Sequence, residues 1–395
     1  MRSKRIGILV NHFMGWNGGI DFIKHLIWGL QESAQKYNGQ IIIVQKIDDT
    51  FIKKKGRFYK LKHYYLKRLL VGYFYNKKPD RFKEFNNIGY LTYSNDNQLA
   101  KLLCRKKIFT LLPLVFENLI NIPIQKIGYL PDCQHKYYPN YFTAEEIKDR
   151  DFLFKKVVAT YLKIIVNANS VKEDLINFFE AKQDQIFVLP FTPKLHLEYL
   201  KDNSCRIEKY NLSEKYFIIS NQFWQHKDHP TAFRAFSELI KTDKYKNLKL
   251  ICTGLLEDYR NPKYIGEQMQ LIKDLGIVDK VIFLGLIPKI EQIEIMKGAI
   301  AVIQPTLFEG GPGGGSVWDA ISLGIPSIVS DIKTNLEVKH KMLTFFQSGN
   351  YIDLTDKMEK VLNTNFIKKT HTELMEQSES NMKKLGDYLW QVIFK

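Results

Sequence analysis

Short apolar runs alternate with amphipathic stretches in two separate series, and this alternation limits the folds that the chain can adopt. Buried strands that alternate with helices form a parallel sheet whose two faces are both covered. The sequence therefore predicts two doubly wound α/β domains in tandem. The predicted strands span residues 6–10, 40–46, 127–130, 164–168 and 186–189 in the first series, and 216–220, 248–253, 281–284, 300–304 and 327–330 in the second.

A polar, irregular stretch at 194–213 separates the two series and is typical of a linker. We place the first domain at residues 1–200 and the second at 201–375. The remaining segment, 376–395, is predicted to contain a helix with one apolar face, which must pack on another part of the molecule. The side chains that recur at helical spacing on this face are Leu385, Tyr388, Leu389, Val392 and Ile393.

Composition excludes several classes of protein. The chain has 395 residues, of which 45% are hydrophobic and 13% aromatic, and this content supports large cores rather than disorder. No apolar run reaches the ~18–20 residues of a membrane span. The first ten residues are charged and then apolar, but the apolar run is short, so we expect a buried strand rather than a signal peptide. The four cysteines lack metal-like spacing, which favours reduced thiols and a cytoplasmic location.

Positive charge is concentrated in one aromatic-rich segment. The whole chain has a net charge of +16, and residues 51–85 hold twelve Lys and Arg, two acidic residues and ten Phe and Tyr, a net charge of +10. A solvated surface, a patch for anionic membrane and a nucleic-acid surface are the three alternatives. The segment matches no nucleic-acid-binding fold, so we favour the membrane patch and expect no nucleic acid as a partner.

The most distinctive motif is a glycine-rich loop between the strand 300–304 and a predicted helix at 316–323. A carboxylate, Glu309, stands at its start, and a second, Asp319, follows the glycines. Bare backbone N–H groups and a helix N-terminus favour phosphate, whereas carboxylates accept hydrogen bonds from sugar hydroxyls. The loop therefore predicts a ligand with both groups, such as a nucleotide sugar, and a flexible hinge is the alternative. The glycines of the loop are Gly310, Gly311, Gly313, Gly314 and Gly315.

Two familiar phosphate motifs do not fit this loop. A Walker loop ends in Gly-Lys-Ser or Gly-Lys-Thr, and this loop has no lysine. A dinucleotide fingerprint needs glycines spaced G-x-G-x-x-G, which no frame within 310–315 supplies.

Further candidate residues lie at the ends of other predicted strands. Lys227 precedes a predicted helix at 229–241, where a cation can meet a diphosphate. Gly18 and Gly19 precede a predicted helix at 20–34, and their backbone could approach a phosphate.

His135 follows the strand 127–130 in a polar, aromatic loop. We do not expect zinc there, because Asp132, Cys133 and His135 are too few ligands and no second group lies at zinc spacing. Later in the same domain, Ser170 and Glu173 form a predicted capping box that opens a helix at 171–179.

Four segments together resemble glycosyltransferase family 4 of the GT-B fold. They recur in the order and spacing of that family, and the similarity is strongest over residues 125–335. The segments are Pro131-Asp-Cys-Gln-His135, Asn221-Gln-Phe-Trp-Gln-His-Lys227, Cys252-Thr-Gly-Leu-Leu-Glu-Asp-Tyr-Arg-Asn-Pro262, and residues 309–331.

This resemblance implies two Rossmann-like domains that face one another across a cleft, with a nucleotide sugar on the second domain and an acceptor on the first. It implies that the last helix crosses back to the first domain. The reaction implied is glycosyl transfer with retention of configuration, without a metal or another cofactor.

The resemblance also assigns roles to single residues. Lys227 matches the lysine that contacts the donor diphosphate, and Glu309 matches the first carboxylate of an E-x7-E pattern, which contacts the transferred sugar. Asp319 stands near the second carboxylate, which holds the ribose. His135 matches a histidine near the reacting sugar, and Gly19 matches a glycine beside the phosphates.

Two positions depart from the family pattern. Val317 occupies the eighth position after Glu309, where the family has glutamate, so that Asp319 comes two residues late. Gln222 occupies the place of an arginine five residues before the lysine, so that one cationic contact to phosphate is missing.

We therefore expect a retaining, metal-independent hexosyltransferase that uses a UDP- or GDP-linked sugar. The expected acceptor is a glycan or a lipid-linked glycan of the cell envelope, met in the cytoplasm or at the inner face of the membrane. A GT-B nucleotide-sugar epimerase and a basic nucleic-acid-binding protein are the alternatives.

Overall fold

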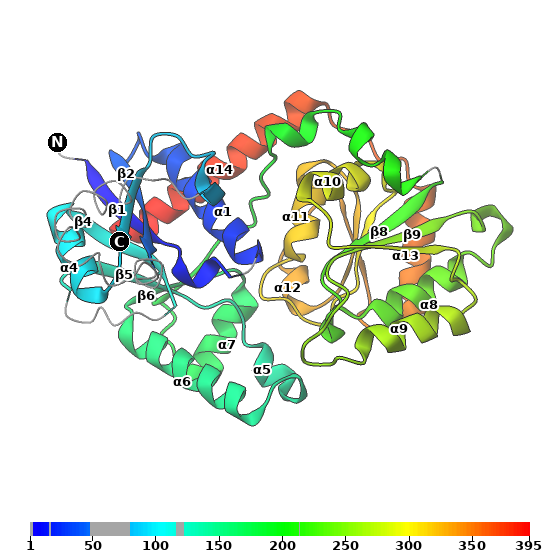
Figure 1. Cartoon of the computed structure of the whole chain (residues 1–395), viewed down its shortest axis with the longest axis horizontal. Helices are drawn as coiled ribbons and strands as arrows, with labels where there is room; N and C mark the ends of the chain where they lie inside the picture. The colour runs from blue at the N-terminus through cyan, green and yellow to red at the C-terminus, as the bar shows by residue number, and fades with distance from the viewer. Residues whose placement is uncertain (1–2, 16, 48–79, 116–121, 213) are drawn as a thin grey trace, which may run out of the picture.

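The computed structural model describes residues 3–15, 17–47, 80–115, 122–212 and 214–395, which form two lobes of alternating strands and helices (Figure 1). Within these residues the N-terminal lobe holds a seven-stranded parallel sheet in the order β3-β2-β1-β4-β5-β6-β7. Its strands are β1 (Lys4–Leu9), β2 (Gly39–Lys46), β3 (Gly89–Tyr93), β4 (Ile108–Leu114), β5 (Gln125–Tyr129), β6 (Lys163–Val166) and β7 (Ile186–Val188).

The C-terminal lobe repeats this architecture. Over the described ranges its sheet has six parallel strands in the order β10-β9-β8-β11-β12-β13. The strands are β8 (Tyr216–Ser220), β9 (Lys249–Thr253), β10 (Val281–Gly285), β11 (Val302–Gln304), β12 (Ser327–Ser330) and β13 (Leu343–Phe346). The prediction of two doubly wound α/β domains is confirmed.

Helices connect the strands in both lobes, as parallel pairing requires. In the N-terminal lobe they are α1 (Asn17–Ser33), α4 (Asp96–Arg105), α5 (Gln134–Tyr137), α6 (Ala144–Thr160) and α7 (Asn169–Phe179). In the C-terminal lobe they are α8 (His229–Leu239), α9 (Tyr264–Asp274), α10 (Lys289–Gly298), α11 (Gly314–Ser322), α12 (Lys333–Leu336) and α13 (Tyr351–Asn363).

Burial on both faces explains why the strands read as continuous apolar runs. Along β2, Ile41 and Ile43 belong to one apolar cluster, whereas Ile42 and Val44 belong to the cluster on the opposite face. All five residues of β8 are buried in the same way. Because the sheets are fixed by packing on both sides, the loops at their carboxyl ends have a rigid base.

The last helix, α14 (His371–Phe394), leaves the C-terminal lobe and packs on α1 of the N-terminal lobe (Figure 1). It begins ten residues before the stretch 381–395 that the apolar stripe marks, and Thr370 caps it in a capping box with Glu373. The contact with α1 is close, because a Cβ atom at Gly386 would lie 2.0 Å from the carbonyl oxygen of Gly29. The indole of Trp390 donates to the carbonyl of Leu30 at 3.0 Å.

The basic segment 51–85 lies outside the described residues except for its last six. Within that part, Phe82 and Phe85 are buried in the core of the N-terminal lobe. These two aromatic rings therefore do not face a membrane, in contrast to the sequence-based expectation for the segment. Among the described residues, no helix combines the length and the apolar character needed to cross a bilayer.

Candidate functional site

Lys227 and Glu309 form the centre of the candidate site. Lys227 ends a short 3-10 helix, Gln225–Lys227, between β8 and α8, and Glu309 lies in the loop between β11 and α11. The ammonium of Lys227 and Oε1 of Glu309 form an ion pair, and the two side chains are only 11% and 13% exposed. The structure thus brings together the two residues that the sequence singled out, at the carboxyl edge of the sheet where ligands bind in doubly wound folds.

A chain of hydrogen bonds orients the Glu309 carboxylate. The side-chain amide of Gln304 donates to Oε1 of Glu309 at 2.9 Å, and Asn221 donates to the Gln304 carbonyl at 2.8 Å. Within the described chain, Oε2 of Glu309 makes no hydrogen bond, so it is available to accept one from a ligand hydroxyl.

The chain of hydrogen bonds continues to His229, whose Nε2 lies 2.8 Å from Oδ1 of Asn221 and whose Nδ1 lies 3.3 Å from the hydroxyl of Tyr264. Burial, together with the positive charge of Lys227, lowers the pKa of His229 to about 3. The imidazole is therefore neutral and donates its Nε2 hydrogen to Asn221. This bond fixes the Asn221 amide with its NH₂ group toward Gln304.

The glycine-rich loop has a backbone that only glycine adopts readily. Gly313 and Gly314 have φ angles of +71° and +63° and lead into α11. The first amides of that helix have no intrahelical acceptor and give its N-terminus partial positive charge. A Cβ atom at Gly314 would lie 3.3 Å from Oε1 of Glu309, so that glycine also keeps this space open.

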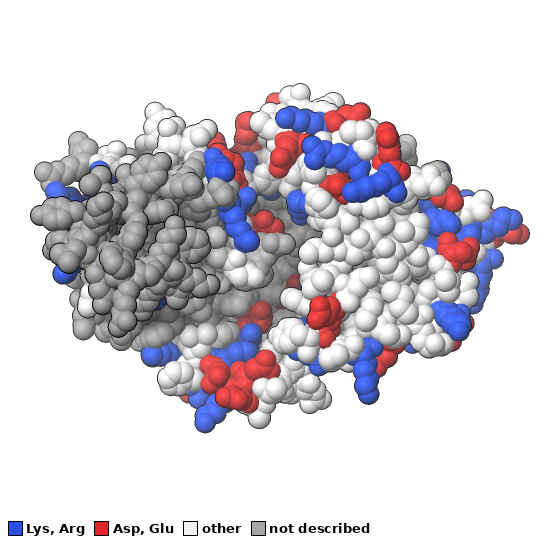
Figure 2. All heavy atoms as spheres, viewed as in Figure 1, with Lys and Arg blue, Asp and Glu red and all other residues white. Residues whose placement is uncertain are grey.

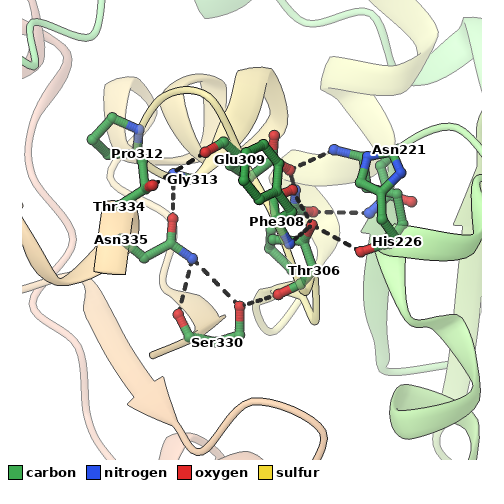
Figure 3. A network of polar contacts seen from close by, with 12 residues as sticks. Asn221, His226, Thr306, Phe308, Glu309, Pro312, Gly313, Ser330, Thr334 and Asn335 are labelled. Atoms are coloured by element: carbon green, nitrogen blue, oxygen red, sulfur yellow. Dashed lines mark hydrogen bonds and ion pairs between the residues drawn. The ribbon is translucent and has the colours of Figure 1, made fainter. Parts of the chain in front are cut away.

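Two residues from α12 hold the glycine-rich loop in place. Asn335 accepts a hydrogen bond from the Gly313 amide at 2.7 Å and donates to the Ser330 carbonyl at 2.9 Å, as Figure 3 shows. Thr334 donates to the carbonyl of Glu309 at 3.1 Å. One short helix therefore fixes the loop at Glu309, just before the glycines, and at Gly313 among them.

The loops that carry Lys227 and Glu309 are also joined to each other. The amide of Leu307 donates to the His226 carbonyl at 2.8 Å, and the Thr306 hydroxyl donates to the same carbonyl at 3.2 Å (Figure 3). Burial, together with the positive charge of the neighbouring Lys227, lowers the pKa of His226 to about 2. The loops that carry the two charged residues are thus held together by hydrogen bonds and form one connected frame.

The N-terminal lobe closes over this frame. A Cβ atom at Gly310 would lie 2.3 Å from the carbonyl oxygen of Pro131, and one at Gly311 would lie 3.0 Å from Cβ of Asn167. The Tyr138 hydroxyl donates to the carbonyl of Leu307 at 3.3 Å. On the face in Figure 2 the surface is hollowed where the lobes meet. The site therefore lies between the two domains.

His135 lies in the N-terminal lobe and points into it. Its side chain is fully buried, with Nε2 2.9 Å from Asp151, while Nδ1 accepts a hydrogen bond from Arg150 at 3.1 Å. Burial lowers the pKa of His135, and the positive charge of Arg150 lowers it further. The structure does not join His135 to the network around Glu309, although its loop, through Pro131, contacts Gly310.

Asp319 lies on α11 and pairs with Lys289 of α10. Burial raises the pKa of the Asp319 carboxyl, and Lys289 opposes that shift. Val317, at the family position of the second glutamate, is buried in an apolar cluster. Gly18 and Gly19 lie in the first turn of α1, in the same lobe as His135. None of these residues is hydrogen-bonded to Lys227 or Glu309.

Sequence reasoning assigned no individual role to several residues that build the site. Asn221 directly follows β8, and Gln304 is the last residue of the neighbouring strand β11. A polar residue at a strand end was the sequence feature that could have identified both. Asn335 could be found in the same way, as a polar residue just beyond β12. Arg260 stands in the segment 252–262 that resembles the family, and it donates to Gln134 of the N-terminal lobe at 3.1 Å.

The sequence comparisons identify relatives of the C-terminal half most clearly. Residues 201–384 match the family model described as "Glycosyl transferases group 1". The chain is 25% identical over 213 residues to the O-antigen chain mannosyltransferase RfbU of Salmonella typhimurium, an alignment that covers 54% of this chain and 53% of that protein. The chain thus spans about half the length of the curated relatives it matches.

Solved structures match over the whole chain. A glycosyltransferase from Rickettsia africae aligns over 100% of both chains with a TM-score of 0.63 and 14% identity. The HepE protein of Anabaena, in complex with UDP-glucose, aligns over 98% of both chains with a TM-score of 0.58 and 13% identity. At these identities the likeness shows a shared fold. The family match shows that residues 201–384 are similar to the glycosyl transferases of group 1, and the solved structures show that the whole chain has the GT-B fold.

Proposed function

We propose that this protein transfers a hexosyl group from a nucleoside diphosphate sugar to a glycan or lipid-linked acceptor, with retention of configuration. One observation carries the proposal. A buried lysine and a buried glutamate are paired beside the N-terminus of α11, on a glycine-rich loop that faces the other domain. In a site of this kind, a positive charge that can bind phosphate lies next to a carboxylate that can accept hydrogen bonds from sugar hydroxyls.

The donor would take the place of the ion pair. The diphosphate would accept hydrogen bonds from Lys227 and from the first amides of α11, and Glu309 would then accept from hydroxyl groups of the sugar. When the bond between the anomeric carbon and the diphosphate oxygen breaks, the diphosphate keeps the electron pair. Lys227 and the helix amides stabilise this charge. The acceptor oxygen forms the new bond to the same carbon, and its proton passes to the departing diphosphate oxygen.

The relatives support the choice of substrate class. One curated relative is named as a mannosyltransferase of the O-antigen chain, and a solved structure of the same fold contains UDP-glucose. We therefore propose a UDP- or GDP-linked hexose as donor and an envelope glycan as acceptor. We place the reaction in the cytoplasm at the inner face of the membrane, which the basic segment 51–85 would approach through its charge.

Metal independence and the roles of His135 and Asp319 belong to the same proposal. Lys227 and the helix amides would carry out the charge neutralisation that a divalent cation performs in other transferases. Asp319 would bind the ribose only if it left Lys289. His135 would act by holding the loop 131–135 against Gly310. Activity that survives an excess of EDTA would agree with the first point.

Calorimetric titration with UDP, GDP and single-stranded DNA is the first experiment. We expect one of the nucleotides to bind and Lys227→Ala to abolish that binding, whereas binding of DNA alone would support the nucleic-acid alternative. A panel of nucleotide sugars, with products identified by mass spectrometry, would then name the donor. Conversion of the donor to its epimer without any acceptor would overturn transfer in favour of an epimerase.

A further inference from the structure

The N-terminus of α7 in the N-terminal lobe is capped by a residue of the C-terminal lobe. Glu337, directly after α12, accepts hydrogen bonds from the amide of Asn169 at 2.6 Å and from the amide of Ser170 at 2.7 Å. The side-chain amide of Asn169 donates to the same carboxylate at 3.1 Å. Glu337 therefore fills, across the domain interface, the role that a capping side chain usually fills within its own helix.

This arrangement corrects the prediction that Ser170 opens α7 in a capping box. The helix begins at Asn169, its N-cap position is Ala168, and no side chain of α7 itself caps it. The hydroxyl of Ser170 instead lies 3.0 Å from that of Thr334, in a buried contact between the lobes. Without Glu337, the first amides of α7 would have no protein acceptor at the interface.

The same short segment holds the glycine-rich loop. Thr334, which meets Ser170, donates to the carbonyl of Glu309, and Asn335 accepts from the Gly313 amide. Residues 334–337 therefore contact the glycine-rich loop on one side and α7 on the other. A change in domain docking at α7 can reach the loop through this segment, because both sets of contacts are made by adjacent residues.

We infer that Glu337 is a positioning residue that couples closure of the two domains to the geometry of the glycine-rich loop. This inference rests on the proposed function, because it assigns the coupling to the donor site. The helix N-terminus carries partial positive charge, and a carboxylate that accepts two backbone hydrogen bonds there is favoured by both effects. Docking of α7 on Glu337 would hold Thr334 and Asn335, and therefore Glu309 and Gly313, in place.

A second ion pair beside this contact provides a control. Lys333 and Glu173 also connect the two lobes, but their side chains are 66% and 52% exposed. Exposed pairs of this kind contribute little, because water and salt screen them. We therefore expect the coupling to depend on Glu337 and hardly at all on Lys333.

The test measures the distance between the domains and needs no ligand. Spin labels are attached at Lys148→Cys on α6 and Glu257→Cys beyond β9, in a background with Cys104→Ser and Cys205→Ser, because those two native cysteines are exposed. Double electron–electron resonance is then recorded for this protein, for Glu337→Gln and for Lys333→Gln. Hydrogen exchange of residues 309–315 is followed in the same variants.

We expect Glu337→Gln to lower the ratio of closed to open molecules about 10-fold, the effect of losing one hydrogen bond to a charged group. Hydrogen exchange of residues 309–315 should become faster in the same variant. Lys333→Gln should match the parent protein in both measurements. An unchanged distance distribution in Glu337→Gln, or an equal change in Lys333→Gln, would overturn the coupling.

Nucleotide binding separates this inference from the proposed function. The affinity for UDP or GDP should change little in Glu337→Gln, because Lys227 and the α11 amides are intact, while kcat for transfer should fall. If neither nucleotide binds the parent protein, the proposed function fails, and the distance measurement still decides the role of Glu337 in closure.

Discussion

At the scale of the residue, the site depends on two opposite charges that are both shielded from water. Within the described residues, neither Lys227 nor Glu309 forms an ion pair with a second residue that could compensate for the loss of the first partner. Removal of one partner from such a pair leaves an uncompensated charge, which costs more than the pair itself contributes. Substitutions here can therefore lower stability as well as activity, and the two effects need separate measurements.

Lys227→Ala should lower the rate of transfer by at least ~100-fold, because the leaving diphosphate loses its cation. The double variant Lys227→Met/Glu309→Gln separates this effect from stability, because two neutral side chains replace the buried pair. We expect its melting temperature to return toward that of the native protein while its activity stays low. Recovery of activity in the double variant would mean that Lys227 has only a structural role.

Glu309→Gln should reduce activity far more than Asp319→Asn. Glu309 faces the glycine-rich loop and has a free carboxylate oxygen, whereas Asp319 is occupied by Lys289. Initial rates of both variants, at saturating and at low donor concentration, give the comparison. Equal losses would show that Asp319 exchanges Lys289 for the donor, and an active Glu309→Gln would remove the proposed sugar contact.

At the scale of the element, the arrangement of helices decides what the loops can do. α12 holds the glycine-rich loop, and α14 ties the C-terminal lobe to α1 of the N-terminal lobe. The second connection depends on close packing, since a Cβ atom at Gly386 would overlap the backbone of Gly29. The pairing of the two domains therefore depends on a glycine far from any ligand.

Gly386→Ala should separate α14 from α1 and destabilise the protein by about 1–3 kcal/mol, the usual cost of overpacking. Gly266→Ala is the matched control, because this glycine also lies within a helix and has no atom within 4 Å of an added Cβ. The control should stabilise the protein by up to about 1 kcal/mol through helix propensity. Urea unfolding of both variants measures the difference, and equal effects would contradict the packing argument.

At the scale of the whole molecule, folding buries titratable groups in neutral form at the base of the site. His226 and His229 are both buried, and their pKa values are lowered to about 2 and about 3. In the unfolded chain they would titrate near the ordinary histidine value of about 6.5. Between these values the unfolded state binds more protons than the folded state, so that stability falls as the pH is lowered.

Lowering the pH from 7 to 5 should therefore reduce the free energy of unfolding by about 2 kcal/mol through His229 alone. A His229→Gln variant has no imidazole to protonate, so its free energy of unfolding should fall by about 2 kcal/mol less than that of the native protein between pH 7 and pH 5. The variant should nevertheless be less stable than the native protein at pH 7. Urea unfolding at the two pH values measures both losses. Identical losses would show that His229 is protonated in the folded protein.

The sequence by itself determined the architecture and the two central residues. Alternating apolar runs predicted both parallel sheets, because strands buried on two faces read as nearly continuous apolar runs. The stripe on 381–395 predicted a packed helix, although its start at His371 was missed because that turn is polar. Lys227 and Glu309 followed from strand ends and from the resemblance to a family, and the structure brings them into contact.

Tertiary structure alone decided which side chains face one another. His135 turns toward Arg150 and Asp151, and Ser170 meets Thr334 instead of capping its own helix. Glu337 lies more than 160 residues from the amides that it caps. Local sequence carries the propensity of each segment, but contacts at such separations depend on how two finished domains dock, which no local pattern encodes.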